Sequence, residues 1–298
     1  MRRAALLLMV CAGCAGAGQL GPQTAESIVR SQSAPLSLVD AASGKAIEAE
    51  AFFAALRGKK VVYVGERHDQ PSDHAVQYAI LRRLHRDEPS LAIGMEMFQI
   101  PFQKVLDKWS AGLIDETVLR RDTEYDKRWG FDFSMYRPIL EYARNQGIEV
   151  VALSVAGEVA YAVAKHGLDS LSPEQAKALP ELDLANEQHR TLFDEEFDPA
   201  EHAVEGAVDR YYQAQVLWDE TMGARVAETL ERPDGPAKML VFAGRVHVEQ
   251  GLGVPDRAAK RGAAPYAVVL PVTAKELKAE LKRPREERSA DFFWVVGQ

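Results

Sequence analysis

The 298-residue sequence predicts an α/β protein: a three-layer domain with a mostly parallel sheet flanked by helices, plus a smaller helical insertion. Two observations carry this prediction. Five short runs are almost continuously apolar, which is typical of parallel strands covered on both faces. Helical patterns lie between these runs, and such alternation of strand and helix favours a layered α/β domain.

The chain opens with the pattern of a secretory leader. Two arginines precede an apolar run that is too short to span a bilayer, and small residues follow. The tripeptide Ala-Gly-Cys ending at Cys14 resembles a bacterial lipobox, so we expect residues 1–13 to be a signal peptide and Cys14 to carry a lipid. Residues 14–35 lack extended apolar periodicity and are expected to form a lipidated flexible tether.

The lipobox also predicts a location. Ala15 follows the cysteine, whereas an inner-membrane retention signal would place Asp there. We therefore expect a lipid-anchored protein of the bacterial cell envelope, in the outer membrane and facing the periplasm or the cell surface.

Beyond the tether, the first expected elements are a turn at residues 43–44 and a helix over residues 48–57. The five apolar runs are then expected as strands over residues 60–66, 91–98, 148–155, 238–244 and 265–272. Apolar residues at helical spacing predict helices over residues 73–86 and 134–146.

The order of these elements predicts the domains. Residues 36–157 and 233–298 are assigned to the α/β domain. No strand pattern occurs between residues 158 and 232, so this stretch is expected to be the helical insertion. Its last helix is expected to begin at Asp198, with Pro199 in the first helical position.

Composition excludes some function classes. The formal net charge is −8 at pH 7, and an acidic surface repels nucleic acid. Neither a G-x-S-x-G elbow nor a P-loop occurs, so serine-esterase and nucleotide-phosphate chemistry have no motif in this sequence.

Two expected strands end in the same pattern, a glycine followed three residues later by a histidine. The histidines are His68 and His247, and a third strand delivers Glu96. Because the carboxyl ends of parallel strands share one edge, we expect these side chains and Glu66 to meet there. The glycine of each pattern suits a tight strand exit or a close approach of backbone or ligand.

The neighbours of this cluster carry further expectations. Two carboxylates in one partly buried site repel each other, so the pKa values of Glu66 and Glu96 are expected to be raised. His74, on the following helix, faces either the site or solvent. Asp69 and Asp73 are expected to cap that helix.

Several stretches resemble a known protein family. They are "YVGERHDQPSDHAVQ", "IGMEMFQIPFQKVLDKWSAGLI", "RWGFDFSMYRPILEYARNQGIEVVALS", "YYQAQVLWDETMGARV" and "VFAGRVHVEQGLGVPDRAAKR". Over about residues 36–275 they resemble the ChaN-type haem-binding uptake lipoproteins, which form a wider group with the Tiki, erythromycin-esterase-like and TraB proteins. The resemblance implies an α/β domain with a smaller helical domain, haem binding and a part in bacterial iron uptake. One departure is Ser154, where relatives often carry Asn.

The wider group leaves a second function open. There, the glycine–histidine patterns and nearby carboxylates are associated with metal-dependent or hydrolytic chemistry. The corresponding residues here are Glu66, His68, Glu96 and His247. The alternative function is therefore a hydrolase in which these residues hold a divalent metal ion and Glu66 or Glu96 acts as general base.

The resemblance favours haem as the cofactor. Haem iron accepts His, Met, Tyr or Cys ligands. Besides His68 and His247, the candidates are His74 and the neighbouring Tyr211 and Tyr212, which are expected at the junction between the insertion and the sheet edge. A second copy of the chain is a further candidate partner, in a homodimer.

Other nearby rings are expected to have no part in ligand binding. His189 and His202 are expected to be solvated. Trp129, Phe131 and Phe133 are expected to pack against the helix that begins near residue 134.

Overall fold

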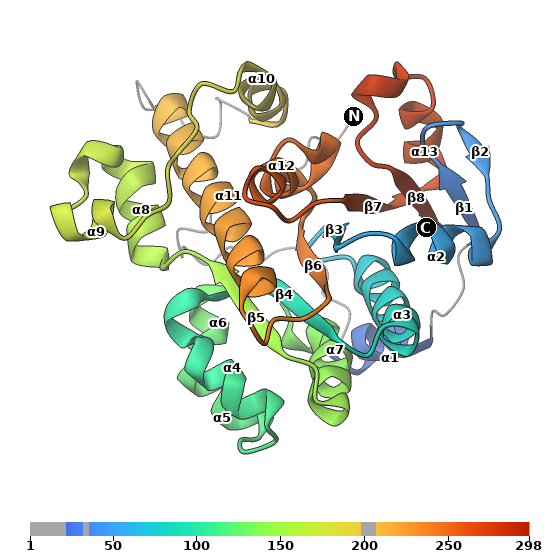
Figure 1. Cartoon of the computed structure of the whole chain (residues 1–298), viewed down its shortest axis with the longest axis horizontal. Coiled ribbons are helices and arrows are strands. Elements are labelled where there is room, and N and C mark those ends of the chain that lie inside the picture. Colours follow the sequence, from blue (N-terminus) through green and yellow to red (C-terminus); the bar gives the residue numbers. More distant parts are fainter. Residues whose placement is uncertain (1–21, 32–35, 198–206, 298) are drawn as a thin grey trace.

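The computed structural model describes residues 22–31, 36–197 and 207–297, which form a layered structure around one eight-stranded sheet (Figure 1). The predicted signal peptide and Cys14 lie outside the described residues. The strands are β1 (Ser37–Asp40), β2 (Lys45–Ala46), β3 (Val61–Glu66), β4 (Leu91–Gln99), β5 (Val150–Ser154), β6 (Lys238–Gly244), β7 (Tyr266–Thr273) and β8 (Phe292–Val296). Their order across the sheet is β2-β1-β8-β7-β3-β6-β4-β5.

The strands from β8 to β5 run parallel, and β1 and β2 add an antiparallel edge. The predicted strands correspond to β3, β4, β5, β6 and β7, and the predicted fold class is confirmed. Strand β8 and the β1–β2 hairpin are not predicted by the sequence patterns. The hairpin is short, and both residues of β2 are exposed, so it lacks the apolar run that identifies the central strands.

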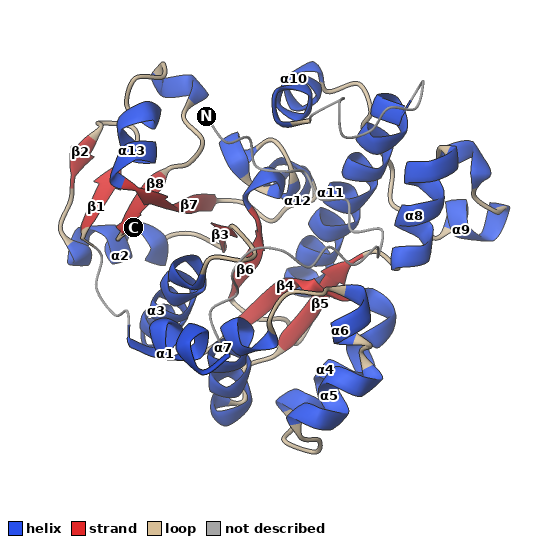
Figure 2. Ribbon diagram, turned by 180° about the vertical axis from the view of Figure 1, so that it is seen from behind, coloured by secondary structure: helices blue, strands red, loops and turns tan. Residues whose placement is uncertain are grey.

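Helices cover both faces of the sheet (Figure 2). One face packs against α2 (Ala49–Arg57), α3 (Pro71–Asp87) and α7 (Phe133–Gln146), joined by α4 (Gln103–Ser110), α5 (Glu116–Asp122) and α6 (Tyr125–Arg128). The other face packs against α11 (Ala207–Glu231), α12 (Val254–Lys260) and α13 (Ala274–Glu280).

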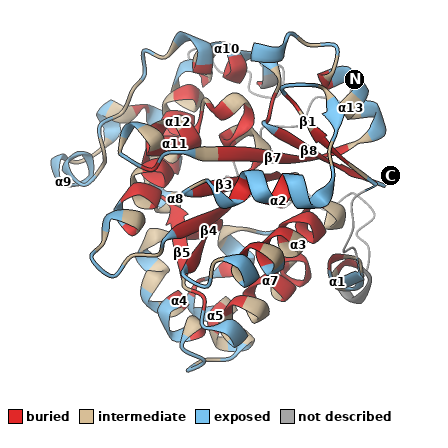
Figure 3. Ribbon diagram, turned by 45° about the vertical axis from the view of Figure 1, so that its right-hand side comes forward, coloured by how far each residue is buried: buried red, intermediate tan, exposed pale blue. Residues whose placement is uncertain are grey.

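Alternation along β3 shows how one strand serves both cores. Val62 and Val64 belong to the first core, and Val61 and Tyr63 to the second. Figure 3 shows the resulting buried sheet between its helical layers. None of the helices in the described part of the chain is both long and apolar enough to cross a bilayer.

Helix α1 (Pro22–Ser31) lies inside the predicted tether and corrects that prediction. It packs against α3 and α7, and Ala25 and Val29 are buried in the contact. Arg30 also forms an ion pair with Glu141 of α7. A ten-residue helix is marginal on its own, so this one gains its stability from docking, which local sequence patterns do not reveal.

Between β5 and β6 the described residues 155–197 and 207–237 contain helices and loops but no strand. Helices α8 (Gly157–His166), α9 (Pro173–Lys177) and α10 (Glu187–Glu196) precede α11. The first half of α11 shares small cores with this region, whereas Met222 and Val226 in its second half pack on the sheet. The predicted helix start at Asp198 and Pro199 lies outside the described residues, and the domain boundaries stay predictions.

Candidate functional site

Strand β3 ends in Glu66, a buried carboxylate that is 2% exposed. Its Oε1 accepts a hydrogen bond from the Tyr136 hydroxyl at 2.7 Å and lies 2.8 Å from Nδ1 of His68. Its Oε2 accepts from the Gln77 amide at 2.6 Å, with Nδ1 of His74 at 3.6 Å. Side chains from α3, α7 and the loop after β3 therefore hold this one carboxylate.

His68 is the more exposed end of this arrangement, with 26% of its side chain accessible. Its Nδ1 donates to Glu66, whereas Nε2 has no hydrogen-bond partner among the described residues. The rings of Trp129 and Phe131, both partly exposed, lie 4.8 and 4.9 Å from the imidazole between centroids. A Cβ on Gly244 would lie 2.9 Å from Cε1 of His68, so this glycine makes room for the ring, as its place in the pattern predicts.

Strands β4 and β6 supply the second half of the site. Oε2 of Glu96 accepts a hydrogen bond from the Gly244 amide at 2.6 Å, and its Oε1 lies 3.4 Å from Nε2 of His247. Nδ1 of His247 lies 2.6 Å from Oδ1 of Asp219. With a carboxylate near each nitrogen, the His247 ring has the surroundings that favour an imidazolium cation, which carries a proton on both nitrogens.

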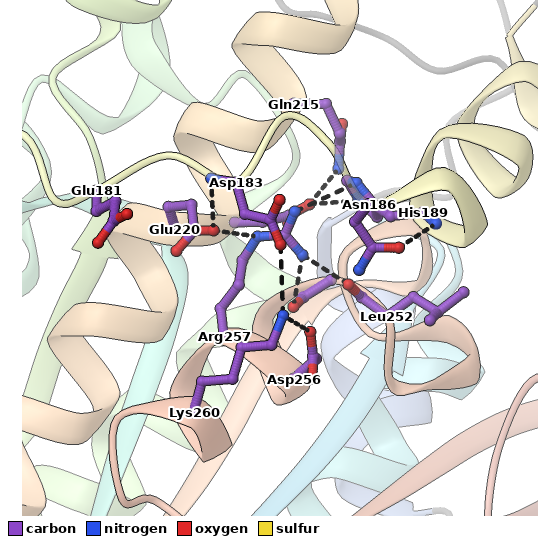
Figure 4. A network of polar contacts seen from close by, with 12 residues as sticks. Glu181, Asp183, Asn186, His189, Gln215, Glu220, Leu252, Asp256, Arg257 and Lys260 are labelled. Carbon is purple, nitrogen blue, oxygen red and sulfur yellow. Dashed lines mark hydrogen bonds and ion pairs between the residues drawn. The ribbon is translucent and has the colours of Figure 1, made fainter.

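Asp219, on α11, extends the polar contacts to His189 of α10, and Figure 4 shows His189 close to Gln215 and Arg257. Oδ2 of Asp219 lies 3.0 Å from Nε2 of His189. Nδ1 of His189 faces the Tyr212 hydroxyl and a guanidinium nitrogen of Arg257, each at 3.3 Å. Because arginine can only donate, Nδ1 of His189 accepts and Nε2 carries the proton. Arg257 is itself buried and paired with Glu220 at 3.2 Å.

The pKa values of the carboxylates run opposite to the expectation. Burial alone raises the pKa of Glu66, but the nearby His74 and His68 rings and the Tyr136 hydroxyl outweigh it and lower that pKa to about 2. The pKa of Glu96 is also lowered, because burial is outweighed by His247 and His68. Repulsion between Glu66 and Glu96 is therefore not the dominant effect, and the expected rise of their pKa values is wrong.

The histidines respond in the complementary way. Burial lowers the pKa of His247, but Glu96 and Asp219 raise it to about 10. Burial likewise lowers the pKa of His68, and Glu66 and Glu96 more than reverse this, so the pKa is raised. The pKa of Asp219 is lowered, since His247 and His189 outweigh its burial. The site is thus a set of mutually neutralising charges.

These shifts predict a pH optimum for stability without added haem. The histidine contribution is fully present below their ordinary pKa of 6.5 and is lost as the pH rises, for His247 toward about 10. The Glu66 and Glu96 contribution is present above their ordinary pKa of 4.5 and is lost as the pH falls, for Glu66 toward about 2. We expect the highest melting temperature between these ordinary values, measured by differential scanning fluorimetry across both limbs. A melting temperature that stays constant from neutral pH to about pH 10 would contradict the shift of His247.

Known proteins resemble this chain in sequence and in fold. The family model described as "Haem-binding uptake, Tiki superfamily, ChaN" matches residues 52–258, which is more than half of the chain. The chain belongs to this family. The resemblance of its sequence motifs to ChaN-type proteins is thereby confirmed.

Two known proteins resemble this chain. A solved structure, described as cofacial heme binding to ChaN of Campylobacter jejuni, superposes with a TM-score of 0.65 at 18% identity and covers 86% of this chain and 95% of that one. At this identity the likeness shows the fold. Protein RETICULATA-RELATED 5, chloroplastic, of Arabidopsis thaliana is 25% identical over 256 residues, which cover 80% of this chain. The chain spans about a third, 34%, of the plant protein's length.

The structure brings the strand-end residues of this family member together. Glu66, His68, Glu96 and His247 all lie at the carboxyl edge of the sheet, as two pairs, Glu66 with His68 and Glu96 with His247. Gly244 lies between the pairs, against both His68 and Glu96. His74 is buried and faces the site, which decides between its two predicted orientations. Nδ1 of His74 contacts Gln77, and Nε2 contacts the main-chain oxygen of His68.

The predicted tyrosines lie elsewhere. Tyr212 is buried in the small core beneath α10, where its hydroxyl contacts His189 and the main-chain oxygen of Asn186. Tyr211 packs beside it, with its ring 5.5 Å from that of Phe197. Both rings pack in the small helical cores, and the core beside Tyr211 includes Val155, which follows β5 directly. Their role as iron ligands stays a prediction.

The sequence patterns do not identify Asp219 as part of the site, and the predicted exposure of His189 is wrong. His189 is buried, with 2% of its surface exposed, and His202 lies outside the described residues. The four-residue spacing of Gln215 and Asp219 on α11 is a weak signal of a polar stripe, and both side chains contact each other and His247. Nothing in the local sequence marks His189 as their partner.

Three smaller expectations have an outcome in the structure. Trp129 and Phe131 pack against the core that includes α7, as expected, and their rings also lie next to His68. Asp73 does not cap α3, because its carboxylate is taken by the main chain and side chain of Arg67. The Ser154 hydroxyl donates to the main-chain oxygen of Glu96 at 2.6 Å, so this departure from the family pattern still provides a hydrogen bond.

The predicted divalent-metal site is not formed in the described part of the chain, where no three His, Cys, Asp or Glu side chains are placed to hold one ion. The physical reason lies in the contacts of the predicted ligands. His247 faces a carboxylate at each nitrogen, and Glu66 already accepts hydrogen bonds at both oxygens. Three of the four predicted ligands, Glu66, Glu96 and His247, therefore already have partners, and only Nε2 of His68 has none among the described residues.

Proposed function

We propose that this protein binds haem at the carboxyl edge of its sheet, with His68 as a ligand of the iron. The observation that carries this proposal is the arrangement of His68, whose Nδ1 donates to the buried carboxylate of Glu66 while Nε2 has no partner among the described residues. A histidine that ligates a metal commonly donates its other ring nitrogen to a carboxylate in this way. Haem would supply an iron coordination position for Nε2.

The surroundings of His68 suit a porphyrin. Trp129 and Phe131 present partly exposed rings next to the imidazole, and flat aromatic surface stacks favourably on other π-systems. Gly244 makes room for the imidazole, since a Cβ there would lie 2.9 Å from Cε1 and 3.0 Å from Nε2 of His68. The site thus combines one available nitrogen with apolar surface beside it.

The other predicted ligands are less suitable. His247 and His74 have contacts at both ring nitrogens, and the Tyr212 hydroxyl is buried against His189. Each of these side chains would have to give up existing hydrogen bonds before reaching iron. Among the predicted metal ligands, Glu66, Glu96 and His247 already have partners, so no specific observation favours the hydrolase, and haem binding is the function that we propose.

Titration with hemin tests this proposal. We expect a soluble form that begins after Cys14 to give a saturable shift of the Soret band. The control is an unrelated acidic protein of similar size, which corrects for non-specific association of hemin. Spectra identical to the control at every ratio would remove haem binding as the function.

We further propose that the protein acts in bacterial haem uptake from the cell envelope, held by a lipid on Cys14. The support is the leader and lipobox pattern together with the family. Helix α1 is docked on the domain, so only residues 15–21 separate Cys14 from it. At about 3.5 Å per residue, these few residues can span roughly 25 Å at most, which would keep the domain close to the membrane.

Replacing Cys14 by serine is expected to release the folded protein from the membrane fraction, because one acylated cysteine is the anchor that the sequence offers. Fractionation followed by immunoblotting measures this. Cys11→Ser is the matched control and should remain membrane-associated. A Cys14→Ser protein that still sediments with membranes would show that another surface holds it.

The homodimer stays a prediction. The relative from Campylobacter jejuni is described by cofacial heme binding, and two haems stacked face to face could be brought together by two copies of one chain. Light scattering coupled to size exclusion, with and without hemin, distinguishes a haem-linked dimer of this chain from a monomer.

A further inference from the structure

Helices α1 and α7 lie against each other, as Figure 2 shows. Two ion pairs set their register, Glu26 with Arg137 and Arg30 with Glu141. Each pair joins residues that are 111 positions apart, so one turn along α1 matches one turn along α7 and the two helices run in the same direction. Val29 of α1 is fully buried. Charge and burial together fix the position of α1 on the domain.

This register decides which end of α1 lies near which edge of the sheet. The first turn of α7 lies at the carboxyl edge, because the Tyr136 hydroxyl contacts Glu66, the last residue of β3. The other end of α7, at Gln146, precedes the start of β5 and therefore lies at the amino edge. Since α1 is parallel to α7, its first residue, Pro22, lies on the side of the carboxyl edge, and its last residue, Ser31, lies on the side of the amino edge.

Docking of α1 also shortens the chain between Cys14 and the domain. A flexible tether over residues 15–35 would have a root-mean-square reach of roughly 25 Å. With α1 docked, only residues 15–21 remain between Cys14 and Pro22, and a flexible chain of that length reaches roughly 15 Å. Because α7 alone is about 21 Å long, a tether this short holds the carboxyl-edge side of the domain nearer to the anchor than the amino-edge side.

The surface at this edge suits a lipid headgroup layer. Trp129 and Phe131, between α6 and α7, have partly exposed rings, and the Lys127 side chain at the end of α6 is 76% exposed. Arg128 of the same helix contacts Gln99, the last residue of β4, which places these residues at the carboxyl edge. Tryptophan is enriched at the headgroup level of bilayers, and long lysine side chains reach toward the same layer.

We propose that the docking of α1 orients the anchored protein, so that the carboxyl edge of the sheet, with Trp129 and Phe131, faces the headgroups of the membrane. This inference rests on the proposed lipid on Cys14. The amino edge, with the end of α7, then faces away from the membrane.

Energy transfer to labelled vesicles tests this orientation. The form that begins at Cys14 contains one cysteine, which can be coupled to a maleimide lipid in phosphatidylcholine vesicles that also carry dansyl-labelled lipid. Two variants each add one tryptophan donor at an exposed position, Lys127→Trp at the carboxyl edge and Gln146→Trp at the amino edge. We expect Lys127→Trp to add transfer to the dansyl groups and Gln146→Trp to add much less. Each variant without coupling to the vesicles is the control.

Two changes near the anchor test the part played by α1. Val29→Asp places a charge in the buried contact and is expected to release the helix. A Gly/Ser linker of about 20 residues, inserted between residues 21 and 22, keeps the domain unaltered but extends the reach of the tether to roughly 30 Å. Either change is expected to abolish most of the difference between the two donors. If Val29→Asp does not fold, the linker variant decides.

Equal transfer from the two donors, or more transfer from Gln146→Trp, would overturn the inference. A difference that persists in the linker variant would also overturn it, because the short tether beyond the docked helix would then not set the orientation. The proposed anchor fails separately, since the vesicles receive the protein by chemical coupling. A Cys14→Ser protein that still sediments with cell membranes overturns the anchor, and with it the orientation in the cell, whatever the vesicles show.

Discussion

Replacing His68 by alanine is expected to weaken hemin binding by about 100-fold or more, because it removes the iron ligand itself, and loss of even an outer-shell partner costs 10- to 100-fold. The substitution should have a smaller effect on folding, since a quarter of the His68 side chain, 26%, is already exposed. Soret titration gives the affinity, and thermal melting without hemin gives the stability. The expected result is a large loss of affinity with a modest loss of stability.

His166→Ala is the matched control for this prediction, because His166 is exposed at the end of α8 and should not affect either measurement. A second comparison is His247→Ala, which removes a buried cation and should reduce stability more than the His68 variant does. Adding imidazole to a His68→Gly protein should restore part of the hemin spectrum of the unaltered protein. If His68→Ala binds hemin as tightly as the unaltered protein, the assignment of this ligand is wrong.

Much of the fold could be predicted from local patterns. A parallel strand buried on both faces has no polar alternation, so β3, β4 and β6 are visible as apolar runs. Their carboxyl ends share one edge, and this geometry alone predicts that Glu66, Glu96 and the two histidines meet. The glycine pattern adds a local reason, since Gly244 lies against His68.

Features that depend on tertiary contacts could not be predicted in the same way. Helix α1 is stable because it docks on α3 and α7, and its own short sequence does not show which surface it packs against. Asp219 lies on a long helix whose apolar and polar residues are consistent with several orientations. His189 arrives from a different helix, and its contact with Asp219 exists only after folding.

The pKa values of Glu66 and Glu96 are lowered rather than raised, which the sequence patterns do not predict. Two buried carboxylates are expected to repel if they are considered alone. Here each lies beside an imidazole, with His68 next to Glu66 and His247 next to Glu96, so opposite charges dominate. A sequence shows which charged residues reach an edge, whereas the pairing of those residues depends on distances of a few ångströms.

Replacing Asp219 by alanine is expected to lower the free energy of unfolding by about 3–5 kcal/mol, which is the typical cost of removing one partner from a buried ion pair. Asp219 is fully buried and lies between the rings of His247 and His189, at 2.6 and 3.0 Å. Its loss leaves two buried N–H groups without their acceptor. Urea unfolding measures the change, and the melting temperature should fall by roughly 2–4 °C for each kcal/mol lost.

Asp209→Ala is the matched control, because Asp209 lies on the same helix and pairs with Arg190 but is 70% exposed. Its effect should stay within about 0.5 kcal/mol, as is usual for an exposed pair. A third variant, Asp219→Asn, keeps the shape but removes the charge that helps to raise the pKa of His247. In that variant His247 should lose its proton at a lower pH, so the loss of stability on the alkaline side should be smaller and should be complete at a lower pH. If Asp219→Ala destabilises no more than Asp209→Ala, the charges at the sheet edge do not stabilise the fold through Asp219.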